Sequence, residues 1–336
     1  MIKKNLILVD IPKADKTWNL YKELNKLNIG EWIIKSYGKS LKKGKYVYIL
    51  RVISYFIVPL SVIFNIKKYN VLFAGQQFYG LNLAFFMRLF HLRKNAKLIV
   101  HTFIYKPKHG FIGYIYEKYM HYVVESKYID CFIVRSSAEI AYYESIFGTI
   151  GTFKYVPFAM YATAPSDTVP SEDKYIFGVG RSNRDWDFLC ESIKGTSYKV
   201  IIACDNYTCV KNPNVTILNN CFDEQMHDYL AKCYAVVIPL KDKKISAGQM
   251  AFLEAMEYGK PVIVTESKGV TDYIQDNVTG FLINNTQNDL LNILDKIYND
   301  EKLYDKVRKS AQKFVRHEFT PYKMDVKIAE IIKSVI

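Results

Sequence analysis

The chain has 336 residues, of which 50% are hydrophobic, and a formal net charge of +13. This length exceeds what one hydrophobic core usually serves and the apolar content argues against a disordered chain, so we expect two folded domains. Six cysteines without a close Cys-x-x-Cys pair argue against a zinc module or a disulfide framework, and favour a reducing compartment.

The net positive charge of the chain lies in its first half. Residues 1–165 contain 24 Lys and Arg against 9 Asp and Glu, a balance of +15, whereas residues 166–336 contain 22 against 24, a balance of −2. Cations alternate with aromatic residues in the runs 42–65 and 85–97. This pattern is typical of a segment at an anionic membrane surface. Nucleic acid would use similar ingredients, but no nucleic-acid-binding module is recognised, and we expect no nucleic-acid partner.

Short apolar runs in the first half predict strands at residues 6–9, 71–74, 96–102 and 131–134. The third of these strands ends near His101, which is a candidate ligand-contacting residue, although a structural role is the alternative. Between the first two strands, residues 46–66 form a long apolar segment interrupted by Arg51 and Pro59. We consider two interpretations of that segment: a helix buried in the first domain, or a helix inserted into a membrane surface.

Residues 174–189 read as an apolar strand, a Gly-x-Gly turn and the start of a helix. This order places Arg181 and Arg184 where the carboxyl end of a strand meets a cleft. Guanidinium groups fixed there would stabilise negative charge on a ligand. Surface ion pairs with Asp185 and Asp187 are the alternative. Those two acids begin a helix, where they complement its dipole, so we expect no metal site.

Further strands are predicted at 200–204, 214–218 and 235–239, alternating with helices. Such alternation favours a doubly wound parallel sheet. The region around Pro157 to Glu172 is rich in Pro, Ser, Thr and Ala and is predicted to be a linker.

The most informative segment is 246–283, which reads as a turn, an apolar helix, a short strand and a Gly turn at Gly269 that opens a second helix. Backbone N–H groups at the first helix start attract phosphate without a charged side chain. The residues of that start are Ser246, Ala247, Gly248 and Gln249. Glu254 follows Gln249 at about 7–8 Å along the axis, similar to the distance from a diphosphate to a ribose, whose hydroxyls a carboxylate accepts. An ordinary core helix is the alternative.

These residues carry a resemblance to a known family. Residues 174–300 resemble the nucleotide-sugar half of GT-B glycosyltransferases, in particular family 4 (glycosyl transferases group 1), through the Gly-Arg turn, the LEAM helix, Gly-Lys-Pro-Val and the Gly turn. The resemblance implies an α/β fold of the GT-B type, with two Rossmann-like doubly wound domains facing a central cleft. It implies an acceptor-side, membrane-facing domain at 1–162, a nucleotide-sugar-binding domain at 172–317, and a last helix at 318–336 that packs back on the first domain.

The resemblance also implies roles for individual residues. Glu254 would bind the donor ribose, and Arg181 and Arg184 would grip the diphosphate. Ser246 stands where the family usually has an acid that contacts the donor sugar. Phe222 lies in the loop that holds the base in relatives, with an ordinary core role as the alternative.

The resulting hypothesis is a hexosyltransferase that needs no metal and no cofactor and uses a nucleotide-diphosphate sugar, with UDP-sugar favoured. The expected acceptor is a lipid-linked glycan in cell-surface polysaccharide synthesis, and the expected mechanism retains the anomeric configuration. We expect a cytoplasmic protein, peripheral on the inner face of the membrane. A non-catalytic GT-B-like subunit supporting a partner transferase is the alternative that Ser246 favours, and an epimerase or phosphorylase on the same fold is a third.

Overall fold

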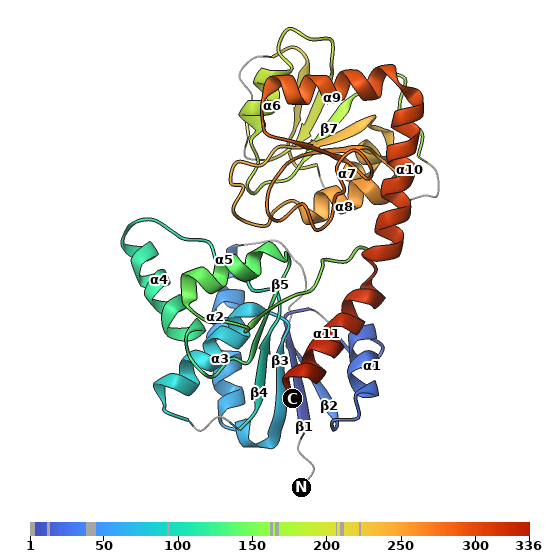
Figure 1. The fold of residues 1–336 in the computed structure, drawn as a ribbon. Helices are drawn as coiled ribbons and strands as arrows, with labels where there is room; N and C mark the ends of the chain where they lie inside the picture. The colour runs from blue at the N-terminus through green and yellow to red at the C-terminus, as the bar shows by residue number, and fades with distance from the viewer. Residues whose placement is uncertain are drawn as a thin grey trace. The chain divides into compact units, whose positions relative to one another are not determined.

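The computed structural model describes residues 4–11, 14–37, 45–92, 95–161, 164, 168–205, 207–208, 212–221 and 223–336. The chain forms two compact units: the first comprises residues 1–157 and 322–336, and the second comprises residues 158–321. Each unit is built on a six-stranded parallel sheet with helices on both faces (Figure 1). The predicted α/β class with two doubly wound domains is therefore confirmed.

The central strands of the first sheet are mostly apolar and buried, as expected for a parallel sheet covered on both faces, whereas its two edge strands are partly exposed. In chain order they are β1 (Lys4–Val9), β2 (Trp32–Ser36), β3 (Tyr69–Ala74), β4 (Lys97–Val100), β5 (Cys131–Val134) and β6 (Phe153–Tyr155). Their order in the sheet is β2-β1-β3-β4-β5-β6, so the direction of winding reverses between β1 and β3. Such a reversal marks the carboxyl edge between these two strands as a place where ligands bind.

Two helical layers cover the first sheet. One contains α2 (Lys45–Ile63), α3 (Gln77–Leu89), α4 (Gly110–Val124) and α5 (Ala138–Phe147), and a short 3₁₀ turn, η1 (Ile66–Lys68), follows α2. The other contains α1 (Asn19–Lys26) and α11 (Pro321–Val335), so the last helix of the chain packs on the unit that contains the first strand.

Helix α2 is joined to α3 and α4 through one buried side chain. Pro59 lies inside α2 and has no N–H to donate, so the carbonyl of Tyr55 lacks its helical partner. Asn82 of α3 replaces that partner, because its Nδ2 donates to the Tyr55 carbonyl at 2.7 Å. The Oδ1 atom of Asn82 accepts from the Tyr119 hydroxyl of α4, also at 2.7 Å. Asn82 thus ties three helices into one layer.

The second sheet has the order β12-β11-β10-β7-β8-β9, and its winding reverses between β7 and β10. Its strands are β7 (Ile176–Val179), β8 (Val200–Ala203), β9 (Val215–Leu218), β10 (Ala235–Ile238), β11 (Val262–Thr265) and β12 (Phe281–Ile283). The helices α7 (Asp223–Lys232) and α8 (Gln249–Glu257) pack on one face, and α6 (Trp186–Ser192) and α9 (Gln287–Asn299) pack on the other. Helix α10 (Glu301–Glu318) contributes its first turns to the core with α6 and α9 and its later turns to the core with α7 and α8.

The last strand of the first sheet, β6, ends at Tyr155, and Val156 is the buried residue that follows it. One sequence-based prediction of an element is wrong. A second helix was expected after Gly269, but residues 268–273 form turns. The backbone there makes single-turn bonds, such as Tyr273 N–H to Val270 O at 2.9 Å, and the polar segment 275–280 then pairs with itself instead of extending a helix.

Candidate functional site

Three loops meet at the carboxyl edge of the second sheet, beside its switch point. They follow β7, β10 and β11, three strands that are neighbours in the sheet. Asn183 and Asp242 clasp the first two loops together: Asn183 Nδ2 donates to the Asp242 carbonyl at 2.9 Å, and the Asp242 N–H donates to Asn183 Oδ1 at 2.8 Å. Segments about 60 residues apart in the chain therefore form one surface.

The start of α8 is shaped by two glycines. Gly248 adopts a left-handed conformation (φ 90°) at the N-cap and provides no side-chain cap, so the first-turn N–H groups of α8 are not bonded by a cap side chain. A Cβ on Gly269 would lie 2.5 Å from the Cα of Ser246, so only glycine lets these two loops pack together. The Oγ atom of Ser246 accepts from Gln249 Nε2. Ser246, Gly248, Gln249 and Gly269 are thus brought together at one helix start.

The two arginines of the Gly turn differ in their surroundings. Arg181 is half exposed and pairs with Asp205, with Nη2 at 2.8 Å from Oδ2. Arg184 folds back over Gly180 and donates to backbone carbonyls of its own turn, from Nε to Val179 at 3.1 Å and from Nη1 to Ser182 at 2.8 Å. Burial lowers the pKa of Arg184 to about 10, so the group stays charged at neutral pH. Arg181 reaches the surface, whereas Arg184 shapes the turn and adds positive charge behind it.

Glu254 is mostly buried, with 18% of its side chain exposed, and it is paired with a histidine that the sequence did not single out. Nε2 of His227, on α7, lies 2.8 Å from Oε1 of Glu254, and the His227 ring stacks near Tyr258. Burial raises the pKa of Glu254, while the hydrogen bond and charge of His227 lower it. No sequence spacing signals this pair, because the two residues lie on different helices that the tertiary fold brings together.

The remaining acids near the Gly turn have local partners. Asp185 caps α6 by accepting from the Phe188 N–H at 3.3 Å, and Asp187 accepts from the Tyr207 hydroxyl at 2.9 Å. Within the part of the chain that the structure describes, no three His, Cys, Asp or Glu residues gather as metal ligands. Phe222, the predicted base-contacting residue, lies outside the described residues.

His101 lies in the first unit, at the end of β4, and has a different environment. Its Nε2 is 2.7 Å from Nη2 of Arg135, and its Nδ1 is 3.2 Å from the Thr102 hydroxyl. Because a guanidinium only donates, Nε2 must accept, which places the ring proton on Nδ1. Burial and the Arg135 charge hold the pKa of His101 well below its ordinary value. The ring is therefore neutral, and its Nε2 is already engaged.

The second-unit site combines an uncapped helix start, an exposed guanidinium and a carboxylate on the next turns of the same helix. The helix start and Arg181 suit a phosphate group, since both present donors and positive charge. Glu254 suits a diol, because an ionised carboxylate accepts two hydroxyl hydrogen bonds.

Comparisons with known proteins match part of the second unit to a family and the whole chain to a fold. Residues 206–314 match the family model described as "Glycosyl transferases group 1". No curated protein sequence matches the chain. Among solved structures, HepE of Anabaena in complex with UDP and glucose has 14% identity and a TM-score of 0.66, with 99% of this chain and 100% of that chain covered.

Two other solved structures are similar over almost their whole length. Sucrose-phosphate synthase from Thermosynechococcus elongatus has 15% identity and a TM-score of 0.68, with 99% of each chain covered. A glycosyltransferase from Rickettsia africae has 14% identity and a TM-score of 0.61, with 99% of this chain and 98% of that chain covered. At these identities the likenesses establish the fold, which is the one predicted from residues 174–300.

Proposed function

We propose that this GT-B protein, whose residues 206–314 match the glycosyl transferases group 1 family, transfers a hexose from a nucleotide-diphosphate sugar to a glycan acceptor. The observation that carries the proposal is the position of Glu254 on α8, behind the uncapped start at Gly248. HepE was solved with UDP, with UDP-glucose, and with UDP and glucose, which supports a UDP-sugar as the donor here. No other cofactor is part of the proposal.

In the proposed reaction the diphosphate lies at the start of α8, where first-turn N–H groups and Arg181 stabilise the charge of the leaving group. Glu254 accepts the ribose hydroxyls, and Ser246 contacts the donor sugar from the position where relatives carry an acid. Arg184 holds the Gly turn in shape. These fixed positive groups do the work that a metal ion does in other transferases, so we propose a metal-independent reaction.

The proposed stereochemical outcome is retention through front-face attack without a protein nucleophile, as the resemblance to family 4 implies. The acceptor is proposed to be a lipid-linked glycan in cell-surface polysaccharide synthesis, met by the first unit at the cytoplasmic face of the membrane. The positive charge of the first half of the chain supports this location, because anionic lipid attracts basic surfaces.

The test is calorimetric binding of UDP to the full chain and to variants. Arg181→Ala and Glu254→Ala should each weaken UDP binding by roughly 100-fold, equivalent to about 3 kcal/mol for one charged contact, and abolish transfer. Arg308→Ala removes a cation that pairs with Asp305 on α10 and serves as the matched control, with unchanged affinity. Wild-type affinity in Arg181→Ala or Glu254→Ala would remove the role assigned to that residue.

A second candidate is a non-catalytic subunit that binds a nucleotide sugar and supports a partner transferase. The observation that favours it is Ser246, whose hydroxyl is bonded to Gln249 where relatives carry an acid. Incubating the purified chain with UDP-sugars and a lipid-linked glycan acceptor decides between the two: hydrolysis or transfer of the sugar excludes the non-catalytic subunit, whereas donor binding without turnover in the presence of the acceptor contradicts the enzyme.

A further inference from the structure

The outward side of α2 is apolar and exposed. Tyr46, Ile49, Ile53 and Ile57 recur every three or four residues, which places them on one stripe of the helix. Their exposed fractions lie between 45% and 72%. A helix packed on a sheet normally turns such a stripe toward the core. Of the described helices, α2 is the one long and apolar enough to cross a membrane, yet only 22% of the window 46–63 is buried. The prediction that this segment is a helix buried in the first domain is therefore wrong for the outward side of α2.

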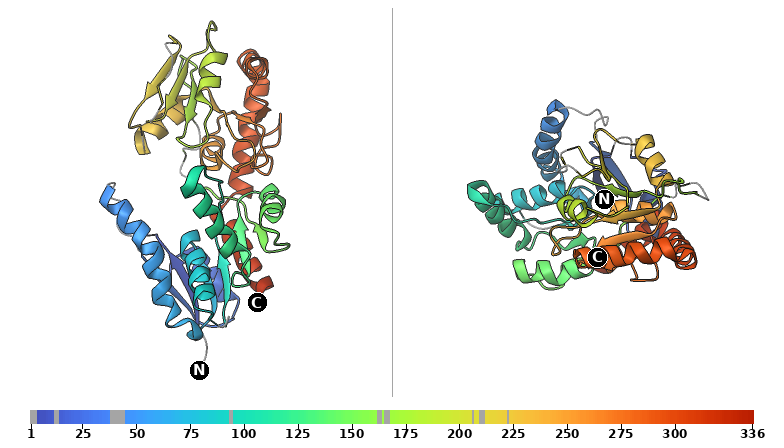
Figure 2. Two further views of the ribbon diagram at one scale, coloured as in Figure 1. Left: turned by 90° about the vertical axis from the view of Figure 1, so that its left-hand side faces the viewer. Right: turned by 90° about the horizontal axis from the view of Figure 1, so that it is seen from above.

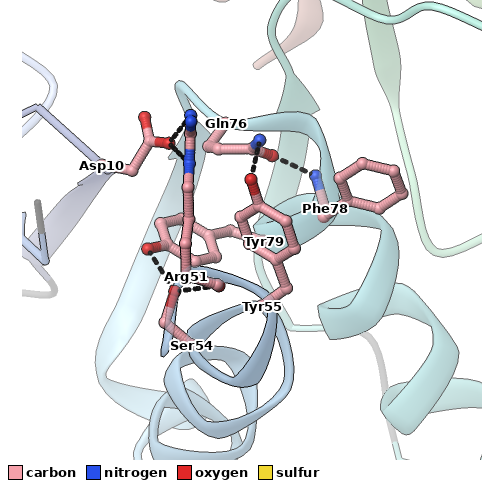
Figure 3. A network of polar contacts seen from close by, with 7 residues as sticks. All are labelled: Asp10, Arg51, Ser54, Tyr55, Gln76, Phe78 and Tyr79. Carbon is pink, nitrogen blue, oxygen red and sulfur yellow. Dashed lines mark hydrogen bonds and ion pairs between the residues drawn. The ribbon is translucent and has the colours of Figure 1, made fainter. Parts of the chain in front are cut away.

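The inward side of α2 is held to the unit by polar contacts, which Figure 3 shows together. Arg51 pairs with Asp10 at the end of β1, with Nε 3.1 Å from Oδ2. The Ser54 hydroxyl is 3.3 Å from the Tyr79 hydroxyl, and Gln76 donates to the Tyr55 hydroxyl at 3.2 Å. A helix that crossed a bilayer would have to break these contacts. The geometry therefore favours a helix that lies flat on a surface.

The first turns of α4 present a second apolar surface. Phe111 and Ile112 are 77% and 74% exposed, and Tyr114 and Ile115 are also exposed. Cations lie over the aromatic rings of the same helix: Lys118 Nζ is 5.5 Å from the centre of the Tyr114 ring. Large apolar side chains flanked by lysines are what an interfacial segment needs, since the apolar groups enter the acyl boundary while the cations meet phosphate.

The two apolar surfaces lie in one helical layer. Helix α3 packs against both α2 and α4, and the views in Figures 1 and 2 place the three helices beside one another on one face of the first sheet. Both α2 and α4 run from the carboxyl edge of the parallel sheet toward its amino edge, because each precedes a strand. Their apolar first turns thus project at the edge that holds the switch point of the first sheet.

The charge around this layer identifies the partner. From Trp32 to Tyr116 the sequence contains no Asp or Glu, while Lys and Arg recur throughout. This stretch includes all of α2 and α3 and the apolar turns of α4. A second copy of the chain would bring the same positive charge and be repelled. An anionic surface with an apolar interior fits both properties.

We propose that the stripe of α2 and the first turns of α4, here called the membrane face, dock on a bilayer that contains anionic lipid, with Phe111 and Ile112 inserted. The inference rests on the proposed function and adds how the protein reaches a lipid-linked acceptor. Docking through the membrane face places the bilayer next to the carboxyl edge of the first sheet. Arg51 and Asp10 then link the docked helix to that edge.

The test is co-sedimentation of the full chain with vesicles of phosphatidylglycerol and phosphatidylcholine, and with vesicles of phosphatidylcholine alone. We expect binding to the anionic vesicles that weakens as salt rises, and little binding to the neutral ones. The double variants Phe111→Ser with Ile112→Ser, and Ile53→Ser with Ile57→Ser, should each bind at least tenfold more weakly, since they remove apolar area from the interface. Ile150→Ser with Val169→Ser removes two exposed apolar side chains elsewhere and should bind like the wild type.

Each other outcome overturns the membrane face. Equal binding of all variants, absence of wild-type binding, or insensitivity to salt would do so. If the wild type is a dimer in solution and the serine variants are monomers, the surface binds a second copy of the chain instead. Resistance to carbonate extraction would make α2 a spanning helix. UDP binding is measured on the same samples: if it is absent while vesicle binding follows the expected pattern, the donor assignment fails and the membrane face stands.

Discussion

Two acids three residues apart on α8, Glu254 and Glu257, differ in burial and in hydrogen-bond partners. Glu257 is buried, and its carboxylate is satisfied by Arg316 at 3.1 Å and by the Ala164 N–H at 2.9 Å. Glu254 keeps part of its side chain exposed and is bonded through Oε1 to His227. The sequence singled out Glu254 through the resemblance of its helix to the family. The structure adds the reason that Glu257 is unsuited to a ligand: it is buried, and both of its carboxylate oxygens already accept hydrogen bonds within the fold.

His227 is predicted to position Glu254 and to set the pH range over which the proposed donor binds. Burial raises the Glu254 pKa and His227 lowers it, so His227→Ala should raise that pKa further. Because the ribose hydroxyls need an ionised acceptor, UDP affinity should fall as pH decreases through the Glu254 pKa, and the fall should begin at higher pH in His227→Ala. Calorimetric titration with UDP between pH 5 and pH 8 measures this shift.

Two companion variants separate positioning from a general loss of structure. His227→Gln retains a side-chain N–H donor and should restore most of the wild-type pH profile. Glu254→Gln has no titrating carboxyl and should bind weakly at every pH. An unshifted profile in His227→Ala would show that the histidine does not act through Glu254.

At the scale of elements, the layer of α2, α3 and α4 depends on a proline and the asparagine that compensates for it. Pro59 removes a helical bond inside α2, and Asn82 replaces it from α3. A sequence pattern identifies Pro59 as an interruption, which weakens the prediction of a continuous helix. Only the packed structure reveals that the lost bond is replaced by a neighbour, so α2 continues through residue 63.

Asn82→Ala is therefore expected to lower the free energy of unfolding by about 1–3 kcal/mol, because the Tyr55 carbonyl and the Tyr119 hydroxyl lose their partner in a buried place. In a Pro59→Ala background the residue at 59 can donate to the Tyr55 carbonyl, so the same Asn82 substitution should cost less. Urea unfolding of the four proteins of this cycle measures the coupling. Strictly additive effects would contradict the compensation.

At the scale of the whole molecule, the proposal assigns different functions to two units of the same architecture. The second unit offers anion and diol chemistry at its switch point, and the first offers the acid-free, basic stretch and the membrane face. The first and last helices of the chain are bonded within the first unit. Asn19 of α1 donates to Oδ2 of Asp325 of α11 at 3.2 Å, although the two residues are 306 positions apart in the sequence. The last helix is thus part of the first core.

Asp325 makes the stability of the first unit depend on pH. Burial raises its pKa to about 6 from 3.8, with Glu23 adding to the rise and Asn19 and Arg135 opposing it. The folded state therefore holds the proton more tightly than the unfolded chain, and stability should fall as pH rises from about 4 to 6, by at most about 3 kcal/mol. Asp325→Asn removes this slope and should stabilise the unit at pH 7.5 but not at pH 4. Urea unfolding at both pH values, with hydrogen exchange of α11 as the readout, tests this; a stabilisation equal at both would contradict it.

The sequence by itself determined the fold class, most strands and the segment that carries the candidate site. Apolar runs of four residues specify buried parallel strands such as β5 and β10, and short-range motifs such as Gly-Lys-Pro-Val mark the helix and strand around Glu254. These features are local, so a linear pattern contains them. The Gly turn at Gly269 was predicted as well, but the helix expected after it is a series of turns.

Only the tertiary structure decided which side chains meet. His227 meets Glu254, and His101 is held neutral by burial beside Arg135, because the fold brings distant segments of the chain together. Arg184 folds inward because of the shape of its own turn. The exposure of α2 was also beyond the sequence, because an apolar helix has the same composition whether it faces a core or a membrane. Burial and hydrogen-bond partners are properties of packing, and a periodic pattern specifies which residues share a face but not what that face contacts.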